Sequence, residues 1–267
     1  MLLAPIMDGI AKWLASDYSP AQITWLRFVV HFLIFLPFAL AKHGIREFIY
    51  CHWQGQFFRG LFLCLGVGLM FLSLKFIPIA EALGIFFISP LIVTILSPLI
   101  LKEAVGTRQI VSVVAGFIGA LLVIQPGYAH FHWALLLPVA GGFCFAGYLL
   151  ISRKMAGQSP VLVTHTLSGM VGVIILAFFM PWQWTTPADF TDVMLFFSIG
   201  VVGAVSHGLV LVAYSRAPAP LLAPFAYVEI FTGTALGYFI FNQFPNSVAW
   251  AGIGIIVLSG VYVVYRK

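Results

Sequence analysis

The sequence has few charged residues, and this shortage excludes most soluble folds. Of its 267 residues, 8% are charged and 62% are hydrophobic, and the mean hydropathy is +1.07. A soluble globular domain carries about 25% charged residues, so this chain could not cover a surface that faces water. Its solvent is predicted to be the lipid bilayer, where spanning helices and closed barrels are the possible backbones. The apolar runs are continuous rather than alternating, which predicts helices.

Other absences narrow the function. The sequence has no nucleotide-binding loop, so we do not expect ATP-driven transport by this chain alone. Cys51, Cys64 and Cys144 have no metal or redox spacing, and we expect no metal and no cofactor. The net charge of +5 is not gathered on one face, so nucleic-acid binding is not expected. No Ser, His and Asp set suited to hydrolysis is found, and we do not expect an enzyme.

Ten apolar segments are candidates for membrane spans. About 20 helical residues cross a hydrocarbon core of about 30 Å. The predicted segments are residues 2–15, 20–41, 57–74, 80–101, 109–126, 131–151, 160–181, 193–214, 217–241 and 247–265. Short turns such as Gln125-Pro126-Gly127 and Asn242 to Asn246 leave no room for a soluble domain. The first segment is short, so either that helix is stunted or its true start lies upstream of Met1.

The distribution of Lys and Arg predicts that both termini are cytoplasmic. In this orientation the inside loops and the tail hold ten of the thirteen Lys and Arg residues, while the outside loops hold only Lys75. The ten are Lys42, Arg46, Arg59, Lys102, Arg108, Arg153, Lys154, Arg216, Arg266 and Lys267. The predicted location is the cell inner membrane.

A shift of the sequence by 140 residues indicates an internal repeat. The shift superposes Ser19-Pro20 on Ser159-Pro160, Gly60 on Gly200, Pro78 on Pro218 and Glu103 on Gln243. Because each copy holds five helices, an odd number, the copies must face opposite ways across the membrane. We therefore predict an all-α membrane protein of ten transmembrane helices, built as two inverted five-helix repeats in residues 1–127 and 128–267. Inverted repeats are typical of transporters that bind substrate between the halves near the midplane.

The first two helices carry charges that need a partner or a wet cavity, because a charge at the bilayer centre costs about 2.5–3.5 kcal/mol on insertion scales. Asp8 and Arg27 lie equally far from the turn between their helices, at a depth of about 10 Å. We expect them to pair or to face one cavity. The alternative is that the pair only holds the two helices of the hairpin together and has no role in binding substrate. Lys12 is spaced i,i+4 from Asp8 and could pair with it instead.

Glu229 lies near the middle of the ninth segment, close to Tyr227, and the apolar stretch around it holds no basic residue. It could bind and release a proton during transport, or hold a cationic group on the cargo. The alternative is a protonated carboxyl group that is hydrogen-bonded to a neighbouring helix. Glu229 is the strongest single candidate for a functional residue.

The histidines and one tyrosine give weaker signals. His31 shares a helix face with Arg27, His207 lies in the eighth segment, and His165 lies near the inner end of the seventh. Each is more often a satisfied core histidine than part of a site. Tyr148 could line a cavity or only pack.

Small residues and prolines predict local features of the bundle. Ser112, Gly116 and Ala120 form a stripe suited to close helix contact. The predicted spans contain internal prolines, each of which removes a backbone hydrogen bond and can kink its helix. These are Pro90, Pro98 and Pro224.

Several stretches together resemble one family. They are Met7-Asp8-Gly9-Ile10-Ala11-Lys12-Trp13-Leu14, Leu26-Arg27-Phe28, Arg59-Gly60-Leu61, the run from Ser73 to Pro90, Ala223-Pro224-Phe225-Ala226-Tyr227-Val228-Glu229, Gly237-Tyr238 and Phe241-Asn242-Gln243-Phe244-Pro245. The pattern resembles the EamA-type branch of the drug/metabolite transporter superfamily, and its S-adenosylmethionine uptake branch in particular. Gln243 departs from the acid that the family often has there.

The resemblance implies two five-helix repeats, a central cavity and secondary transport or exchange. It carries Asp8, Lys12, Arg27, Tyr227 and Glu229 over as cavity residues. Our working hypothesis is a secondary carrier for a small polar or zwitterionic metabolite, such as S-adenosylmethionine, an amino acid or riboflavin. His31, Tyr148 and His207 complete the candidate binding residues. The alternatives are a structural or assembly protein without cargo and a membrane-embedded enzyme, while the oligomeric state is left open.

Overall fold

The computed structural model describes residues 2–77, 79–124, 132–230, 232, 235–236 and 247–264. Several predicted features lie outside these residues: the turn at 125–127, the segment from Asn242 to Asn246 with Gln243, most of the ninth span beyond residue 230, and the tail with Arg266 and Lys267. We call the residues before the gap at 125–131 the first half, and those after it the second half.

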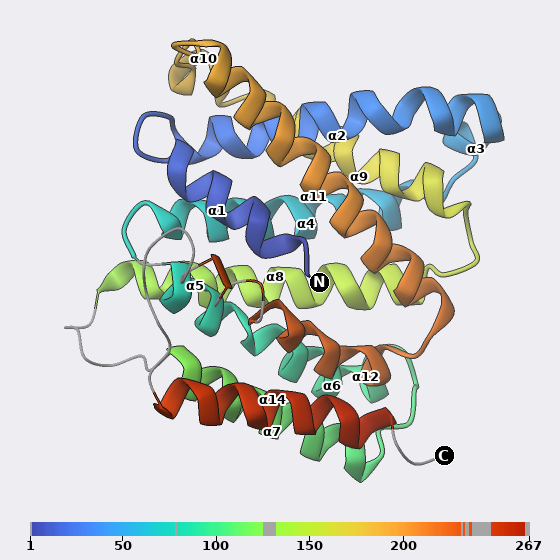
Figure 1. Cartoon of the computed structure of the whole chain (residues 1–267). Coiled ribbons are helices and arrows are strands. Elements are labelled where there is room, and N and C mark those ends of the chain that lie inside the picture. Colours follow the sequence, from blue (N-terminus) through green and yellow to red (C-terminus); the bar gives the residue numbers. More distant parts are fainter. Residues whose placement is uncertain are drawn as a thin grey trace.

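All regular structure in the described residues is helical. The helices of the first half are α1 (Ala4–Leu14), α2 (Pro20–His43), α3 (Arg46–Ile49), α4 (Trp53–Leu74), α5 (Ile79–Phe86), α6 (Ile88–Ile100) and α7 (Thr107–Ile124). Those of the second half are η1 (Trp133–Leu135), α8 (Leu136–Lys154), α9 (Val161–Ala177), α10 (Met180–Gln183), α11 (Phe190–Arg216), α12 (Ala219–Leu222), η2 (Ala223–Val228) and α14 (Ser247–Val264). In the view of Figure 1 most of the long helices run roughly horizontally, and α11 crosses them obliquely.

The all-α membrane fold is confirmed. Among the described residues, five helices are long and apolar enough to cross a membrane, and four shorter apolar helices accompany them. The predicted first span is short in the structure as well, since α1 holds 11 residues. The division at residues 127 and 128 stays a prediction.

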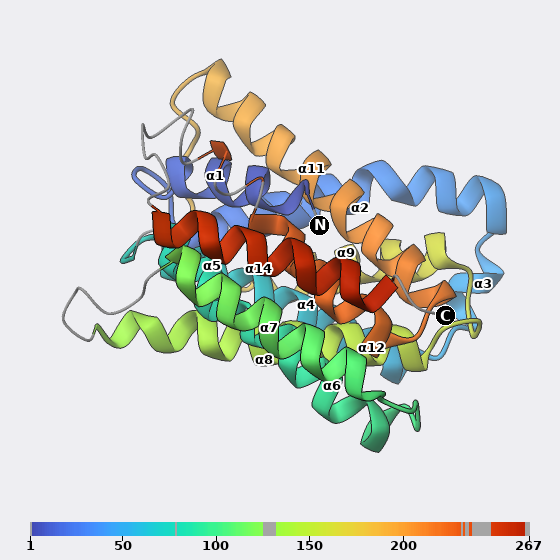
Figure 2. The ribbon, with the colours of Figure 1, turned by 60° about the horizontal axis from the view of Figure 1, so that its bottom comes forward.

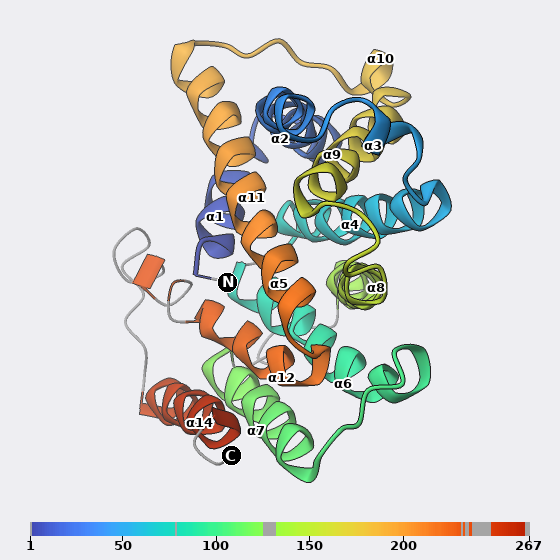
Figure 3. The same ribbon diagram turned by 90° about the vertical axis from the view of Figure 1, so that its right-hand side faces the viewer.

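Helix packing relates the two halves. α2 lies against α9, and α7 lies against α14, at opposite sides of the bundle (Figures 2 and 3). The shift of 140 residues superposes α4 on α11 and α2 on α9. In keeping with this, α4 packs on α9 and α11 packs on α2. Gly60 meets Val171 where α4 crosses α9, and Gly200 meets Val30 where α11 crosses α2. A Cβ atom at either glycine would collide with its valine, so both crossings depend on the residue type that the register repeats.

The predicted fourth span is broken by a proline. Its helix stops at Phe86 and resumes at Ile88, because Pro90 has no N–H to donate to the carbonyl of Phe86. The break lies against α8, where a Cβ atom on Gly142 would lie 3.1 Å from the Phe86 oxygen. Pro98 lies inside α6 without interrupting it, while Pro224 lies in the 3₁₀ turn η2.

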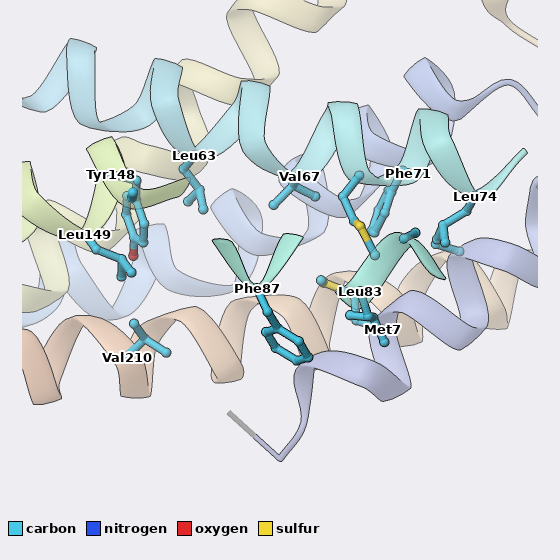
Figure 4. Packing of buried hydrophobic residues seen from close by; sticks show 14 of the residues in the cluster. Met7, Leu63, Val67, Phe71, Leu74, Leu83, Phe87, Tyr148, Leu149 and Val210 are labelled. Carbon is cyan, nitrogen blue, oxygen red and sulfur yellow. The ribbon is translucent and has the colours of Figure 1, made fainter. Parts of the chain in front are cut away.

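The largest hydrophobic cluster draws buried residues from most helices of both halves, α1, α4, α5, α8 and α11 among them. Figure 4 shows Met7, Val67, Phe71 and Leu83 gathered on the facing sides of α1, α4 and α5. These four side chains also form one wall of the cavity described below.

Candidate functional site

A cavity lies between helices of both halves. It encloses about 410 Å³ of space free of protein atoms, counting its open mouth. Its lining residues come from α1, α4, α5, α8 and α11 and from the segment after η2: Ala4, Met7, Asp8, Val67, Met70, Phe71, Leu83, Phe86, Phe145, His207 and Glu229.

Three of the predicted residues line this cavity, and two of them are carboxylates. Asp8 comes from α1 and is 4% exposed, His207 comes from α11, and Glu229 follows η2 and is half-buried. Asp8 and Glu229 are close enough to interact electrostatically. Among the described residues, no cationic side chain lies within 4 Å of either carboxylate. The cavity therefore combines apolar walls with two acids, an arrangement suited to a cationic group or a proton.

Arg27 does not form the expected ion pair with Asp8. The two side chains interact electrostatically, but no Asp8 oxygen lies within 4 Å of the guanidinium. Arg27 instead places Nη2 3.1 Å from Nδ1 of His207 and Nε 3.3 Å from the sulfur of Met7. Its guanidinium thus lies behind the cavity wall that Met7 and His207 form.

Lys12 points away from the cavity. Its ammonium donates to the carbonyl oxygens of Leu74 and Ile77 at the end of α4, and the alternative pair with Asp8 is not formed. A cation at a helix C-terminus binds unpaired carbonyl groups and the negative end of the helix dipole. The structure therefore places Lys12 as a cap on α4.

The histidines form a pair that sequence reasoning could not place. His31 of α2 and His165 of α9 face each other with ring centroids 4.0 Å apart. Nε2 of His165 lies 2.8 Å from the carbonyl oxygen of Ala204, whereas both ring nitrogens of His31 are buried without a partner. Among the described residues, no group of three or more His, Cys, Asp or Glu side chains is arranged to hold a metal ion.

Arg59 is a buried residue, contrary to its expected place in a cytoplasmic loop. It was counted among the loop cations, but it lies in α4 and is 0% exposed. Its Nη2 donates to the carbonyl oxygen of Thr164 and, at 2.7 Å, to the hydroxyl of Ser168, both on α9. The signal was present in the sequence, because Arg59 is spaced i,i+3 from Gln56 and i,i+4 from Leu63 on what proves to be the buried face of the helix.

The two candidate tyrosines are also buried and have different neighbours. Tyr148 of α8 is 0% exposed, with its ring centroid 6.3 Å from that of His207. Tyr227 is not among the cavity-lining residues. Its ring packs on Gly116, in the middle of the predicted small-residue stripe, and its hydroxyl lies 3.5 Å from the carbonyl oxygen of Phe87. Tyr227 thus packs η2 against the helix break at Phe87.

Comparison with known proteins matches the whole chain to one family. The model of the EamA-like transporter family matches residues 5–125 and 132–266. A riboflavin transporter of Vibrio cholerae is 28% identical over 97% of this chain and 88% of its own length. An S-adenosylmethionine uptake transporter of Rickettsia prowazekii is 26% identical over 100% of this chain and 90% of its own length. A solved crystal structure has the same fold, with a TM-score of 0.83 at 17% identity over 98% of this chain and 95% of that one. The resemblance drawn from the sequence is confirmed.

Proposed function

We propose that this chain, which belongs to the EamA-like transporter family and is a membrane transporter of small metabolites, is a secondary carrier for polar or zwitterionic organic cargo. It works by alternating access in the inner membrane, with both termini cytoplasmic. The observation that carries the proposal is the cavity between the two halves, which holds Asp8 and Glu229 against apolar walls.

The cavity fits cargo with a cationic group and an apolar or aromatic body. Asp8 and Glu229 would hold the cation, since opposite charges attract strongly where little water is present. Phe71, Phe86 and Phe145 offer ring surfaces on which a flat cargo group could stack. Two relatives are named for S-adenosylmethionine and riboflavin, which both carry a flat ring system, and S-adenosylmethionine carries cationic groups as well.

Alternating access is supported by the related packing of the two halves. Carriers built from related repeats expose one central site to each side in turn as one half rocks against the other. Here α2 packs on α9 and α7 on α14, so paired helices from the two halves lie on both sides of the cavity. Glu229 could couple this motion to a proton gradient by holding a proton whenever the cation is absent.

The test is a comparison of two Glu→Gln variants in proteoliposomes. Glu229→Gln should lower uptake of labelled S-adenosylmethionine or riboflavin at least about 10-fold, since a hydrogen bond to a charged group contributes about 1.5–3 kcal/mol. Glu47→Gln, which changes an exposed carboxylate on α3, is the matched control. The transported compound should also protect Glu229 from a carboxyl-modifying reagent.

Two results would contradict the proposal. Equal uptake by Glu229→Gln and wild type, together with equal modification of Glu229 with and without cargo, would remove Glu229 from the site. A wild-type protein that inserts correctly but carries no compound from a broad metabolite panel would favour the assembly protein. Chemical conversion of a compound would favour the membrane-embedded enzyme.

A further inference from the structure

Two fully buried arginines lie in the core of the bundle without an acidic partner. Arg27 and Arg59 are both 0% exposed. Among the described residues, which include all eight acidic side chains, no carboxylate oxygen lies within 4 Å of either guanidinium. A buried guanidinium with no carboxylate in contact is costly, because its desolvation is not fully repaid. This arrangement calls for an anion from outside the chain.

Several polar atoms of these and neighbouring side chains are buried and unpaired. They are Nη1 of Arg27, Nε and Nη1 of Arg59, Nδ1 and Nε2 of His31, and the hydroxyl of Tyr148. The Tyr148 hydroxyl lies near that of Ser152 without hydrogen-bonding geometry. An unpaired buried donor destabilises the folded protein, so a set of them in one region indicates a binding function.

These side chains converge from the three helices α2, α4 and α8. Tyr148 of α8 interacts electrostatically with both Arg27 of α2 and Arg59 of α4. His31 of α2 interacts with both arginines and with His165 of α9. α11 leaves space for the guanidinium of Arg27, since a Cβ atom on Gly203 would lie 2.7 Å from its Nε. We call Arg27, His31, Arg59 and Tyr148 the cationic cluster.

The cationic cluster and the cavity share one wall. His207 lines the cavity and also contacts Nη2 of Arg27. Phe145, another lining residue, has its ring centroid 5.6 Å from that of Tyr148. His207 therefore has the two carboxylates of the cavity on one side and the guanidinium of Arg27 on the other.

We propose that the cationic cluster is an anion subsite that receives the carboxylate of the cargo. The guanidinium groups of Arg27 and Arg59 and the hydroxyl of Tyr148 donate to its oxygens, while Asp8 and Glu229 hold a cationic group of the same molecule. This inference rests on the proposed transporter function and names the cargo as a zwitterion of the amino-acid type. His207 and Phe145 are the side chains that must move to join the two compartments.

The experiment uses a pair of ligands that differ in the carboxylate alone. Binding of S-adenosylmethionine and of decarboxylated S-adenosylmethionine is measured on the purified full-length protein by ligand-induced thermal stabilisation, and riboflavin uptake into proteoliposomes is measured in parallel. The variants are Tyr148→Phe and Arg59→Lys. Ser112→Ala, which removes an unpaired buried hydroxyl on α7, is the matched control.

We expect wild type to bind S-adenosylmethionine at least about 10-fold more tightly than its decarboxylated form. Tyr148→Phe should reduce that preference about 5- to 10-fold by weakening the carboxylate form alone, without lowering the melting temperature of the free protein. Arg59→Lys should act in the same direction because an ammonium lacks the planar fork of donors. Ser112→Ala should keep the wild-type preference.

The subsite is overturned if wild type binds both ligands equally, or if Tyr148→Phe weakens both to the same degree. It is also overturned if wild type carries riboflavin and neither ligand of the pair binds, a result that leaves the transporter function intact. Absence of both transport and binding for all three compounds would contradict the proposed function itself.

Discussion

At one end of the bundle, several hydrogen bonds hold the turn between α1 and α2 to the connection between α10 and α11. At the other end, one carboxylate, that of Glu103, binds two elements of the second half. At the first end, Gln22 Nε2 donates to the Thr185 oxygen at 2.6 Å, and the Thr185 N–H donates to Gln22 Oε1 at 2.8 Å. The hydroxyl of Ser19 donates to the carbonyl oxygen of Gln183 at 3.1 Å. Tyr18 donates to the carboxylate of Asp192, and this hydrogen bond raises the pKa of the Tyr18 hydroxyl.

At the second end, Glu103 of the first half holds two elements of the second. Its Oε1 lies 2.6 Å from Nε of Arg153, at the end of α8. Its Oε2 accepts the N–H of Ala219, 2.9 Å away, at the start of α12. Arg153 also donates to the carbonyl oxygen of Tyr214 at 3.4 Å. We call the two regions the Gln22 end and the Glu103 end.

One feature is common to both ends and follows the repeat. Lys12 binds the carbonyl oxygen of Leu74, and Arg153 binds that of Tyr214. The shift of 140 residues superposes Leu74 on Tyr214, so in each half a basic residue of one helix caps a repeated position near the end of another. These two capping contacts therefore follow the repeat, whereas the contacts that join the halves differ between the Gln22 end and the Glu103 end. A carrier whose two ends must open in turn would need closures that can be broken independently.

The largest effect on stability is expected from Glu103→Ala. The change removes an ion pair and leaves Nε of Arg153 and the N–H of Ala219 without their acceptor, so it should lower the free energy of unfolding by about 2–4 kcal/mol. Thermal unfolding in detergent measures the loss, with Glu47→Ala on the exposed face of α3 as the control.

The same variant should open the Glu103 end. Ala219 is 0% exposed, so a cysteine placed there in a protein without its native cysteines should react with a soluble maleimide faster once Glu103 is removed. An unchanged labelling rate, with a loss of stability no greater than that of the control, would show that Glu103 does not hold this end closed.

A smaller effect is expected from Gln22→Leu at the Gln22 end. The side chain is 0% exposed and makes two hydrogen bonds to Thr185. Leucine keeps most of the volume, and the remaining contacts of Ser19 and Tyr18 still hold the turn. We therefore expect a loss of about 1–2 kcal/mol, read from the same unfolding curves. A loss as large as that of Glu103→Ala would contradict the idea that closure at this end is shared among several contacts.

The sequence was sufficient for the features that depend on local pattern. Continuous apolar runs predicted the helices, and the absence of an N–H on Pro90 explains the break at Phe87. The repeated Ser-Pro and Pro markers predicted two related halves, and Gly60 and Gly200 occupy related helix crossings.

Which residues line the cavity could not be predicted from the sequence alone, because it depends on how each helix is rotated about its own axis. Asp8, His207 and Glu229 line the cavity, yet Lys12, equally conspicuous in the sequence, caps α4 instead. A helical position gives depth along an axis but not the neighbour that it faces, so neither the contacts of Arg59 with Thr164 and Ser168 nor the contact between His31 and His165 could be predicted. Both depend on how α4 and α2 are turned toward α9.

The smallest expected effect is that of salt on the destabilisation caused by each variant. It distinguishes the two ends because Glu103 forms an ion pair at one end and Gln22 forms hydrogen bonds between neutral groups at the other. The side chains of Arg153 and Glu103 are 22% and 17% exposed, so dissolved ions can partly screen their attraction. The Debye length falls from about 10 Å at 0.1 M to about 3 Å at 1 M ionic strength. Raising NaCl over this range should therefore shrink the destabilisation caused by Glu103→Ala by up to about 1 kcal/mol. The bonds between Gln22 and Thr185 join neutral groups, so the destabilisation caused by Gln22→Leu should stay constant. Equal salt dependence of the two variants would mean that the Glu103 end is not held mainly by its ion pair.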